Sequence, residues 1–257
     1  MEAYISKYDS LERTIIFHFY VGIGGIGDSL KYFLYILNIC IEHHIKLQLL
    51  TDSLVNNFLK LNYEKMYATP HKVVNPIYIE ITDIPNIHPN INYMITPDKA
   101  YGCLDVYERL VCPSEVFGFT EEVKTNINID LNYISIHLRL GDKHLDTDKS
   151  WVLCKDHERL YDEDRLFNFI EANRDKKIIF FCDSDSYKKK IKSKYDFITT
   201  INRPIGHTSL GNTTTEQVFN TVVEFYLLSN SQHIYTASES GFSMMASKFY
   251  NSPISRI

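Results

Sequence analysis

The segment that decides the fold is Tyr133-Ile134-Ser135-Ile136-His137-Leu138-Arg139-Leu140-Gly141-Asp142. Its apolar residues alternate with other residues at the period of a β-strand. A turn-rich stretch, residues 125–132, precedes it, and the strand ends in an arginine, a glycine and an aspartate. Because this strand has the strongest pattern in the chain and follows a break, we expect it to open a second domain.

Patterns typical of strands and helices alternate on both sides of this segment. In the first half, strands are expected at Thr14–Val21, Lys46–Thr51, Ile77–Ile81 and Tyr93–Ile95, and helices at Asp28–His44, Asp98–Val111 and Pro113–Lys124. In the second half, strands are expected at Lys177–Cys182, Phe197–Thr200 and His233–Thr236, and helices at Ser186–Lys194, Thr215–Ser229 and Gly241–Tyr250. This alternation predicts an α/β fold with parallel sheets. We expect a Rossmann-like domain over residues 1–128, another over 129–257, and a ligand-binding cleft between them.

Composition excludes some classes of partner. The 257 residues carry a formal net charge of −5, so no global attraction to nucleic acid or to an anionic membrane is expected. The polar, acidic N-terminus does not resemble a secretory signal, and the longest apolar run, Tyr32–Ile41, is too short to span a bilayer. The five cysteines form no Cys-x-x-Cys pair and are expected to be reduced. We therefore expect a soluble cytoplasmic protein without a transmembrane segment.

The end of the first quoted strand carries a candidate anion site. His137 and Arg139 are two residues apart, so on a strand their side chains point to the same face. A guanidinium can donate two parallel hydrogen bonds to a diphosphate and stays charged at any working pH. The alternative is a structural ion pair between Arg139 and Asp142, and the residues alone give both interpretations similar weight.

The segment from His137 to Asp142 resembles the His-x-Arg-x-Gly-Asp motif of the α1,2-, α1,6- and protein O-fucosyltransferase superfamily. Two further stretches are similar to the later motifs of that superfamily and follow in the same order. They are Ile178-Ile179-Phe180-Phe181-Cys182-Asp183-Ser184-Asp185, and Leu227-Leu228-Ser229 through Ser238-Glu239-Ser240-Gly241-Phe242-Ser243-Met244-Met245-Ala246. Together these motifs cover most of the second half of the chain.

The resemblance implies a two-domain GT-B glycosyltransferase whose C-terminal half binds a GDP-sugar without a metal ion. Arg139 would contact the β-phosphate, His137 would support the sugar or the phosphates, and Asp183 would lie near the nucleoside. The remaining donor-site residues are then Ser184 and the start of the last helix, Ser240, Gly241, Phe242 and Ser243. A helix N-terminus also favours a phosphate on physical grounds. For Ser240 and Ser243 the alternative is helix capping, which is compatible with phosphate binding.

A glycine-rich loop, Gly22-Ile23-Gly24-Gly25-Ile26-Gly27-Asp28-Ser29, lies between the first strand and the first long helix. It satisfies Gly-x-Gly-x-x-Gly, and Asp52 ends the next strand, so an NAD(P)-dependent oxidoreductase that uses Gly22, Gly24 and Gly27 is an alternative function.

The same loop is similar to the glycine loop of the fucosyltransferases, which would place Gly25 and Gly27 in the donor site. Asp28 stands where that family usually has asparagine, and at this point the sequence looks like the heptosyltransferases, whose aspartate is a catalytic base. Asp28 is therefore the first candidate for the base and His137 the second, and the alternative for Asp28 is a helix N-cap.

Three other patterns each allow more than one interpretation. Asp183-Ser184-Asp185 has the form of a metal-binding Asp-x-Asp step, but the order of the motifs favours the metal-free interpretation. The lysines at 188–190, 192 and 194 are expected to form an exposed helix face rather than a nucleic-acid site. The polar segment Lys143–Glu158 contains Trp151, which would either read the acceptor or anchor the loop by packing.

Taken together, the sequence predicts an inverting, metal-independent glycosyltransferase that moves fucose from GDP-fucose to a glycan or other hydroxyl acceptor. No cofactor, metal ion or nucleic-acid partner is expected. Besides the oxidoreductase, a non-catalytic nucleotide-sugar binder is an alternative.

Overall fold

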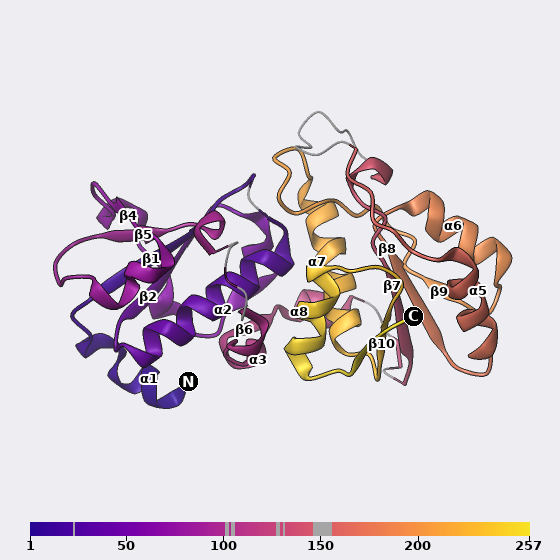
Figure 1. Ribbon diagram of the computed structural model, residues 1–257, viewed down its shortest axis with the longest axis horizontal. Coiled ribbons are helices and arrows are strands. Elements are labelled where there is room, and N and C mark those ends of the chain that lie inside the picture. Colours follow the sequence, from indigo (N-terminus) through magenta and orange to yellow (C-terminus); the bar gives the residue numbers. More distant parts are fainter. Residues whose placement is uncertain (23, 101–102, 104–105, 127–128, 131, 146–155) are drawn as a thin grey trace. The chain divides into compact units, whose positions relative to one another are not determined.

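The computed structural model describes residues 1–22, 24–100, 103, 106–126, 129–130, 132–145 and 156–257 (Figure 1). The segment with Trp151 lies outside these residues. The chain divides into two compact units, Met1–Phe119 and Thr120–Ile257. The division therefore falls earlier than the boundary after residue 128 that the turn-rich stretch suggests. The reason is tertiary, because α4 (Glu121–Thr125) packs against α7 (Thr215–Ser229) of the second unit.

The first unit contains a parallel four-stranded sheet in the order β2-β1-β5-β4. Its strands are β1 (Thr14–Phe19), β2 (Lys46–Thr51), β4 (Ile77–Tyr78) and β5 (Tyr93–Ile95). The central strand β1 is hydrophobic, and Ile15 and Phe17 are fully buried. The long helix α2 (Ile26–Glu42) follows β1 and contacts β2. Around this framework lie α1 (Glu2–Lys7) and short 3-10 turns at Tyr8–Ser10, Leu54–Asn57, Glu64–Met66 and Pro70–Lys72.

Three predicted elements of the first unit are wrong in type or extent. The strand expected at 77–81 ends at Tyr78 and gives way to the 3-10 helix η5 (Ile81–Asn86). The described part of the helix expected at 98–111 has only the turns η6 (Pro97–Ala100) and η7 (Val106–Glu108). The helix expected at 113–124 is divided into α3 (Pro113–Val116), β6 (Phe117–Phe119) and α4.

Strand β6 interrupts that helix because it finds a partner elsewhere in the chain. It pairs antiparallel with β3 (Leu59–Leu61), a strand that the sequence patterns do not predict. Phe117 and Phe119 are buried, and Gly118 between them passes Asn62 so closely that an added Cβ would lie 2.6 Å from its Oδ1. Cross-strand pairing thus outweighs local helix preference here.

The second unit contains a parallel five-stranded sheet in the order β11-β10-β7-β8-β9. Its strands are β7 (Ile134–Leu138), β8 (Ile178–Cys182), β9 (Thr199–Thr200), β10 (Ile234–Thr236) and β11 (Ile254–Arg256). Its other helices are η8 (Asp142–His144), α5 (Glu163–Ala172), α6 (Asp185–Lys194) and α8 (Gly241–Tyr250). The predicted bounds of α7 and α8 are confirmed.

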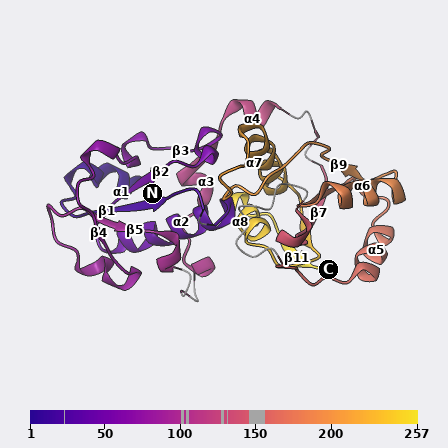
Figure 2. The ribbon, with the colours of Figure 1, turned by 90° about the horizontal axis from the view of Figure 1, so that it is seen from above.

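Helices cover both faces of the second sheet (Figures 1 and 2). On one face Leu166 and Ile170 of α5 and Ile191 of α6 join the core residues of β7 and β8. Helices α7 and α8 lie on the opposite face (Figure 2). Both central strands are buried along their whole length, as expected for a parallel sheet covered on both sides.

The order of the strands indicates where a ligand would bind in this unit. The chain passes from β7 to β8 and β9 in one direction and then returns to β10, on the other side of β7. The direction of winding therefore reverses between β7 and β10. In open α/β sheets a ligand binds at this reversal, outside the carboxyl ends of the strands.

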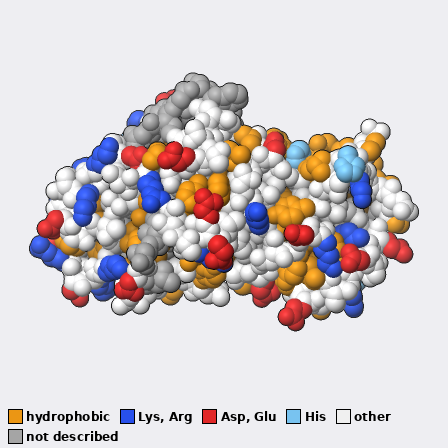
Figure 3. Space-filling model, turned by 180° about the vertical axis from the view of Figure 1, so that it is seen from behind, with side chains coloured by type: hydrophobic (Ala, Val, Ile, Leu, Met, Phe, Trp, Pro, Cys, Tyr) orange, Lys and Arg blue, Asp and Glu red, His pale blue; other side chains and the backbone are white. Residues whose placement is uncertain are grey.

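The surface agrees with the moderate net charge. On the face drawn in Figure 3, acidic and basic side chains are interspersed. Among the described residues, no helix combines the length and the apolar character needed to cross a membrane.

Candidate functional site

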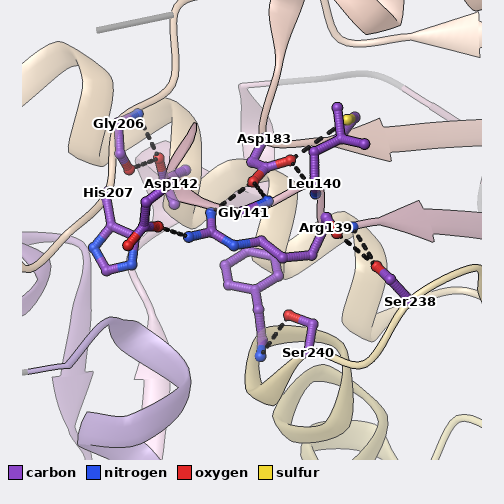
Figure 4. A network of polar contacts seen from close by, with 12 residues as sticks. Arg139, Leu140, Gly141, Asp142, Asp183, Gly206, His207, Ser238 and Ser240 are labelled. Carbon is purple, nitrogen blue, oxygen red and sulfur yellow. Dashed lines mark hydrogen bonds and ion pairs between the residues drawn. The ribbon is translucent and has the colours of Figure 1, made fainter. Parts of the chain in front are cut away.

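Polar residues from four loops meet at the carboxyl edge of the second sheet. Arg139 follows β7, Asp183 follows β8, and Ser238 and Ser240 follow β10. Figure 4 draws them together with Gly206 and His207, from the segment after β9. The reversal between β7 and β10 lies within this group.

Arg139 is held by two carboxylates. Its Nη1 atom lies 2.9 Å from Oδ2 of Asp183, and its Nη2 atom lies 2.5 Å from Oδ1 of Asp142 (Figure 4). The backbone N–H of Arg139 donates to Ser238 Oγ at 2.9 Å, and the Ser238 hydroxyl donates to the Arg139 carbonyl at 2.7 Å. The ion pair with Asp142 that the sequence suggests is therefore present. A guanidinium has five N–H donors, so these two contacts leave donors for a ligand.

Asp183 fixes the turn that carries the arginine. Besides the guanidinium, its carboxylate accepts the backbone N–H groups of Leu140 at 2.8 Å and of Gly141 at 3.0 Å. The side chain is 8% exposed. These contacts make Asp183 a residue that positions Arg139, and its contact with a nucleoside stays a prediction.

Gly141 is required by the shape of the same turn. Its φ of +104° lies in the region that favours glycine. A Cβ at this position would lie 2.6 Å from the carbonyl oxygen of His157. The backbone around His157 packs directly on the turn, because Lys143 N donates to the His157 carbonyl and Arg159 N donates to that of Leu140.

His137 is a buried residue of β7. Its ring stacks on Phe242 with centroids 5.7 Å apart, and its Nδ1 atom has no hydrogen-bond partner. Burial lowers the pKa of His137 to about 4, although Asp183 acts in the opposite direction. The imidazole is thus neutral at physiological pH. Since burial opposes its protonated form, His137 is a poor candidate for the catalytic base.

The start of α8 is capped as expected. Ser240 is the N-cap, and its Oγ accepts the N–H of Phe242 at 3.3 Å. Ser243 donates to the Ser240 carbonyl at 3.1 Å. Gly241 is the first residue of this helix, whose N-terminal dipole favours an anion.

The Asp183-Ser184-Asp185 step turns its two carboxylates to different cations. Asp183 meets Arg139, whereas Asp185 lies 2.7 Å from Lys188 Nζ. Ser184 between them is the N-cap of α6. Among the described residues, no group of three His, Cys, Asp or Glu side chains could hold a metal ion.

Lys188 does not lie on an exposed helix face, and the prediction for this lysine is wrong. The other lysines of the run are exposed, but Lys188 is 2% exposed. Its Nζ lies 3.2 Å from Oε1 of Glu224 and 3.3 Å from the Ile201 carbonyl oxygen. Glu224 was missed by the sequence interpretation. The available signal was a single acidic residue within the apolar stretch of a predicted helix.

The glycine loop of the first unit has the backbone that its sequence suggests. Gly22 and Gly24 have φ values of +112° and +61°. Gly25 is the N-cap of α2, and Gly27 is buried in the first turn of that helix. Asp52 is exposed, and its Oδ1 accepts the N–H of Val21 at 3.0 Å, so this carboxylate holds the start of the loop.

Asp28 is the third residue of α2, so the N-cap interpretation is wrong for it. Its carboxylate pairs with Lys31 at 2.9 Å and is 30% exposed. The Lys31 Nζ in turn lies 4.3 Å from the ring centroid of Tyr32 and 5.4 Å from that of Tyr107. Asp28 is thus an accessible carboxylate beside a fixed cation.

No family model and no curated protein matches this sequence. Several solved structures do match its fold. A mutant of Arabidopsis thaliana FUT1 in complex with GDP has a TM-score of 0.59 at 11% identity, covering 100% of this chain and 73% of that chain. The α-1,6-fucosyltransferase NodZ soaked with GDP-fucose has a TM-score of 0.54 at 12% identity, covering 93% of this chain and 92% of that chain. POFUT1 in complex with GDP has a TM-score of 0.53 at 9% identity, covering 96% and 99%.

The chain therefore has the α/β fold of the GT-B-type fucosyltransferases, built from two Rossmann-like units. The expected fold class is confirmed.

Proposed function

We propose that the protein is a glycosyltransferase that moves fucose from GDP-fucose to a hydroxyl group of a glycan or another acceptor, with inversion and without a metal ion. The fold supports a nucleotide-sugar enzyme, since the similar structures were solved with GDP or GDP-fucose. The observation that carries the proposal is Arg139, which is held at the reversal between β7 and β10 beside the N-terminus of α8.

In this proposal, the donor diphosphate binds between Arg139 and the start of α8. When the donor binds, Asp142 releases Arg139. Its side chain is 22% exposed and is joined to the turn through the Arg139 ion pair. Asp183 keeps its place, since it also binds two backbone amides. Arg139 then turns the N–H groups that face Asp142 toward the β-phosphate.

The residues of the second unit stabilise the leaving group. As the bond between the anomeric carbon and the β-phosphate oxygen breaks, negative charge grows on the phosphate. The guanidinium and the helix N-terminus are fixed before the reaction and are suited to that charge. They supply the positive potential for which other transferases use a metal ion.

Asp28 is the proposed base. The acceptor oxygen attacks the anomeric carbon from the face opposite GDP, and its proton passes to the Asp28 carboxylate. The ion pair with Lys31, at 2.9 Å, holds this carboxylate in a defined position. Its partial exposure leaves it open to an acceptor.

Ligand-dependent thermal stability tests this function. GDP and GDP-fucose should raise the melting temperature without Mn²⁺, because a ligand that binds only the folded state stabilises it. Arg139→Ala should abolish the shift, whereas Arg165→Ala, on the exposed side of α5, should retain it. A shift with NAD alone that survives Arg139→Ala would favour the oxidoreductase, and a UDP shift that needs Mn²⁺ would favour a metal-binding Asp-x-Asp site.

Turnover separates an enzyme from a binder. We expect release of GDP from GDP-fucose in the presence of an acceptor mixture, and no release by Arg139→Ala. Binding of GDP-fucose without any release or transfer would support a non-catalytic nucleotide-sugar binder.

A further inference from the structure

Helix α7 carries polar side chains that are buried. Asn220, Thr221 and Glu224 are 2%, 8% and 4% exposed. Their spacing places them on one side of the helix. A buried polar side chain costs free energy unless it is hydrogen-bonded, so each needs a partner.

Two of these side chains bond directly to the segment that follows β9, and the third is connected to it through Lys188. Asn220 Nδ2 donates to the Pro204 carbonyl at 2.9 Å. Thr221 Oγ1 accepts the N–H of Gly206 at 3.2 Å and lies 3.0 Å from the carbonyl oxygen of the same residue. Glu224 reaches the segment through Lys188, whose Nζ donates to the Ile201 carbonyl at 3.3 Å.

Lys188 connects three elements at one point. It extends from α6 to Glu224 on α7 and to the end of β9, and a third contact joins it to Asp185 at 2.7 Å. The ammonium thus donates hydrogen bonds to the Ile201 carbonyl and to Glu224, and its contact with Asp185 is an ion pair. Both ions of the Lys188–Glu224 pair are buried, and burial raises the pKa of Glu224 to about 7 against the effect of Lys188.

The segment held in this way is compact and ends at the candidate site. A Cβ on Gly206 would lie 2.4 Å from Cγ2 of Thr213, so the chain folds back closely on itself. Thr213 Oγ1 donates to the His207 carbonyl at 2.8 Å, and His207 Nδ1 lies 2.6 Å from Ser209 Oγ. Gly206 and His207 appear with Asp142 at the carboxyl edge of the sheet (Figure 4).

A stability role alone does not account for a buried ion pair. Taking two charges out of water offsets much of their mutual attraction, and well-packed apolar residues in their place are often neutral or stabilising. An ion pair does, however, impose a defined geometry on the groups that it joins. Here those groups include the Ile201 carbonyl and the N-terminus of α6, next to Asp183.

We propose that Lys188 and Glu224 are positioning residues of the donor site. They hold the segment 201–207 in place as one wall of that site, together with Asn220 and Thr221. This inference rests on the proposed function where it concerns the donor, but the positioning of the segment can be measured without any ligand.

Three variants separate positioning from stability. Lys188→Met removes the cation that faces Glu224 and Asp185, and Glu224→Leu leaves Lys188 with Asp185 as its remaining carboxylate, so each should lower the melting temperature. The double variant removes both charges and should regain stability. If the pair positions the wall, the double variant still binds GDP roughly tenfold more weakly than the wild type, because small displacements of a site cost affinity. Lys189→Met, an exposed lysine on the same helix, is the matched control and should bind GDP normally.

Hydrogen exchange provides the readout that needs no ligand. Amides in the segment 201–207 should exchange faster in the double variant than in the wild type, and Lys189→Met should leave them protected. Where the double variant does not fold, the isosteric Glu224→Gln serves for both measurements. Wild-type GDP affinity together with wild-type protection in the double variant would overturn the proposal. If the wild type itself does not bind GDP, the proposed function fails, and the exchange rates alone decide whether the pair holds the segment.

Discussion

The substitution Asp183→Asn tests whether one carboxylate holds the arginine turn. Asp183 accepts hydrogen bonds from Leu140 N, from Gly141 N and from the Arg139 guanidinium, and a weaker one from the Cys182 thiol at 3.6 Å. Asparagine keeps a single carbonyl oxygen, and its amide N–H₂ group faces the remaining donors. A hydrogen bond to a charged group contributes about 1.5–3 kcal/mol. Because Arg139 keeps Asp142 and is 18% exposed, the expected loss of unfolding free energy is about 2–4 kcal/mol rather than the full sum.

Urea unfolding at neutral pH measures this loss, and GDP titration measures the effect on the site. We expect Asp183→Asn to be destabilised and to bind GDP more weakly than the wild type, because Arg139 is no longer held in one orientation. Asp164→Asn is the control, since Asp164 is exposed on α5 and its substitution should change stability by no more than about 0.5 kcal/mol. An Asp183→Asn protein with wild-type stability and wild-type GDP affinity would refute the reasoning.

Three other substitutions probe single features. The pKa of His137 is about 4 in the folded state, below its ordinary value of 6.5. Between these two pH values the unfolded state binds more protons than the folded state, so the protein loses stability as the pH falls from 6.5 toward 4. Between pH 7.5 and 5 the wild type should therefore lose about 2 kcal/mol more than His137→Phe in urea unfolding, and parallel pH profiles would contradict this. Gly141→Ala should cost about 1–3 kcal/mol in thermal unfolding, because of its positive φ and the nearby His157 carbonyl, and an unchanged melting temperature would count against that conformation. Asp28→Asn should slow transfer about 10²- to 10⁴-fold and leave GDP affinity unchanged, whereas a wild-type rate would remove Asp28 as the base.

Features with strong local signals could be predicted well. The strands Lys46–Thr51 and Tyr93–Ile95 and the helices Thr215–Ser229 and Gly241–Tyr250 have the predicted bounds. The two helices have apolar residues at helical spacing, and the two strands are short apolar-rich segments bounded by turn residues. The expected α/β class follows from the alternation of such strand and helix patterns along the chain.

Only some of the contacts in the candidate site could be predicted from the sequence. The motif from His137 to Asp142 places an arginine at the carboxyl end of a strand, and the structure confirms that placement. The second partner of Arg139, Asp183, comes from the neighbouring strand β8. Its pairing with Arg139 depends on which strands are adjacent, and the sequence order alone does not define that.

Local sequence thus determined the elements with strong periodic patterns and the chemistry available at their ends. Tertiary structure decided what depends on distant partners: the pairing of β6 with β3, the position of α4 against α7, and the burial of Lys188 opposite Glu224. The physical reason is that helical and strand periodicity arise between residues a few positions apart. Desolvation, ion pairing and strand adjacency are settled only when segments far apart in the chain exclude water from one another.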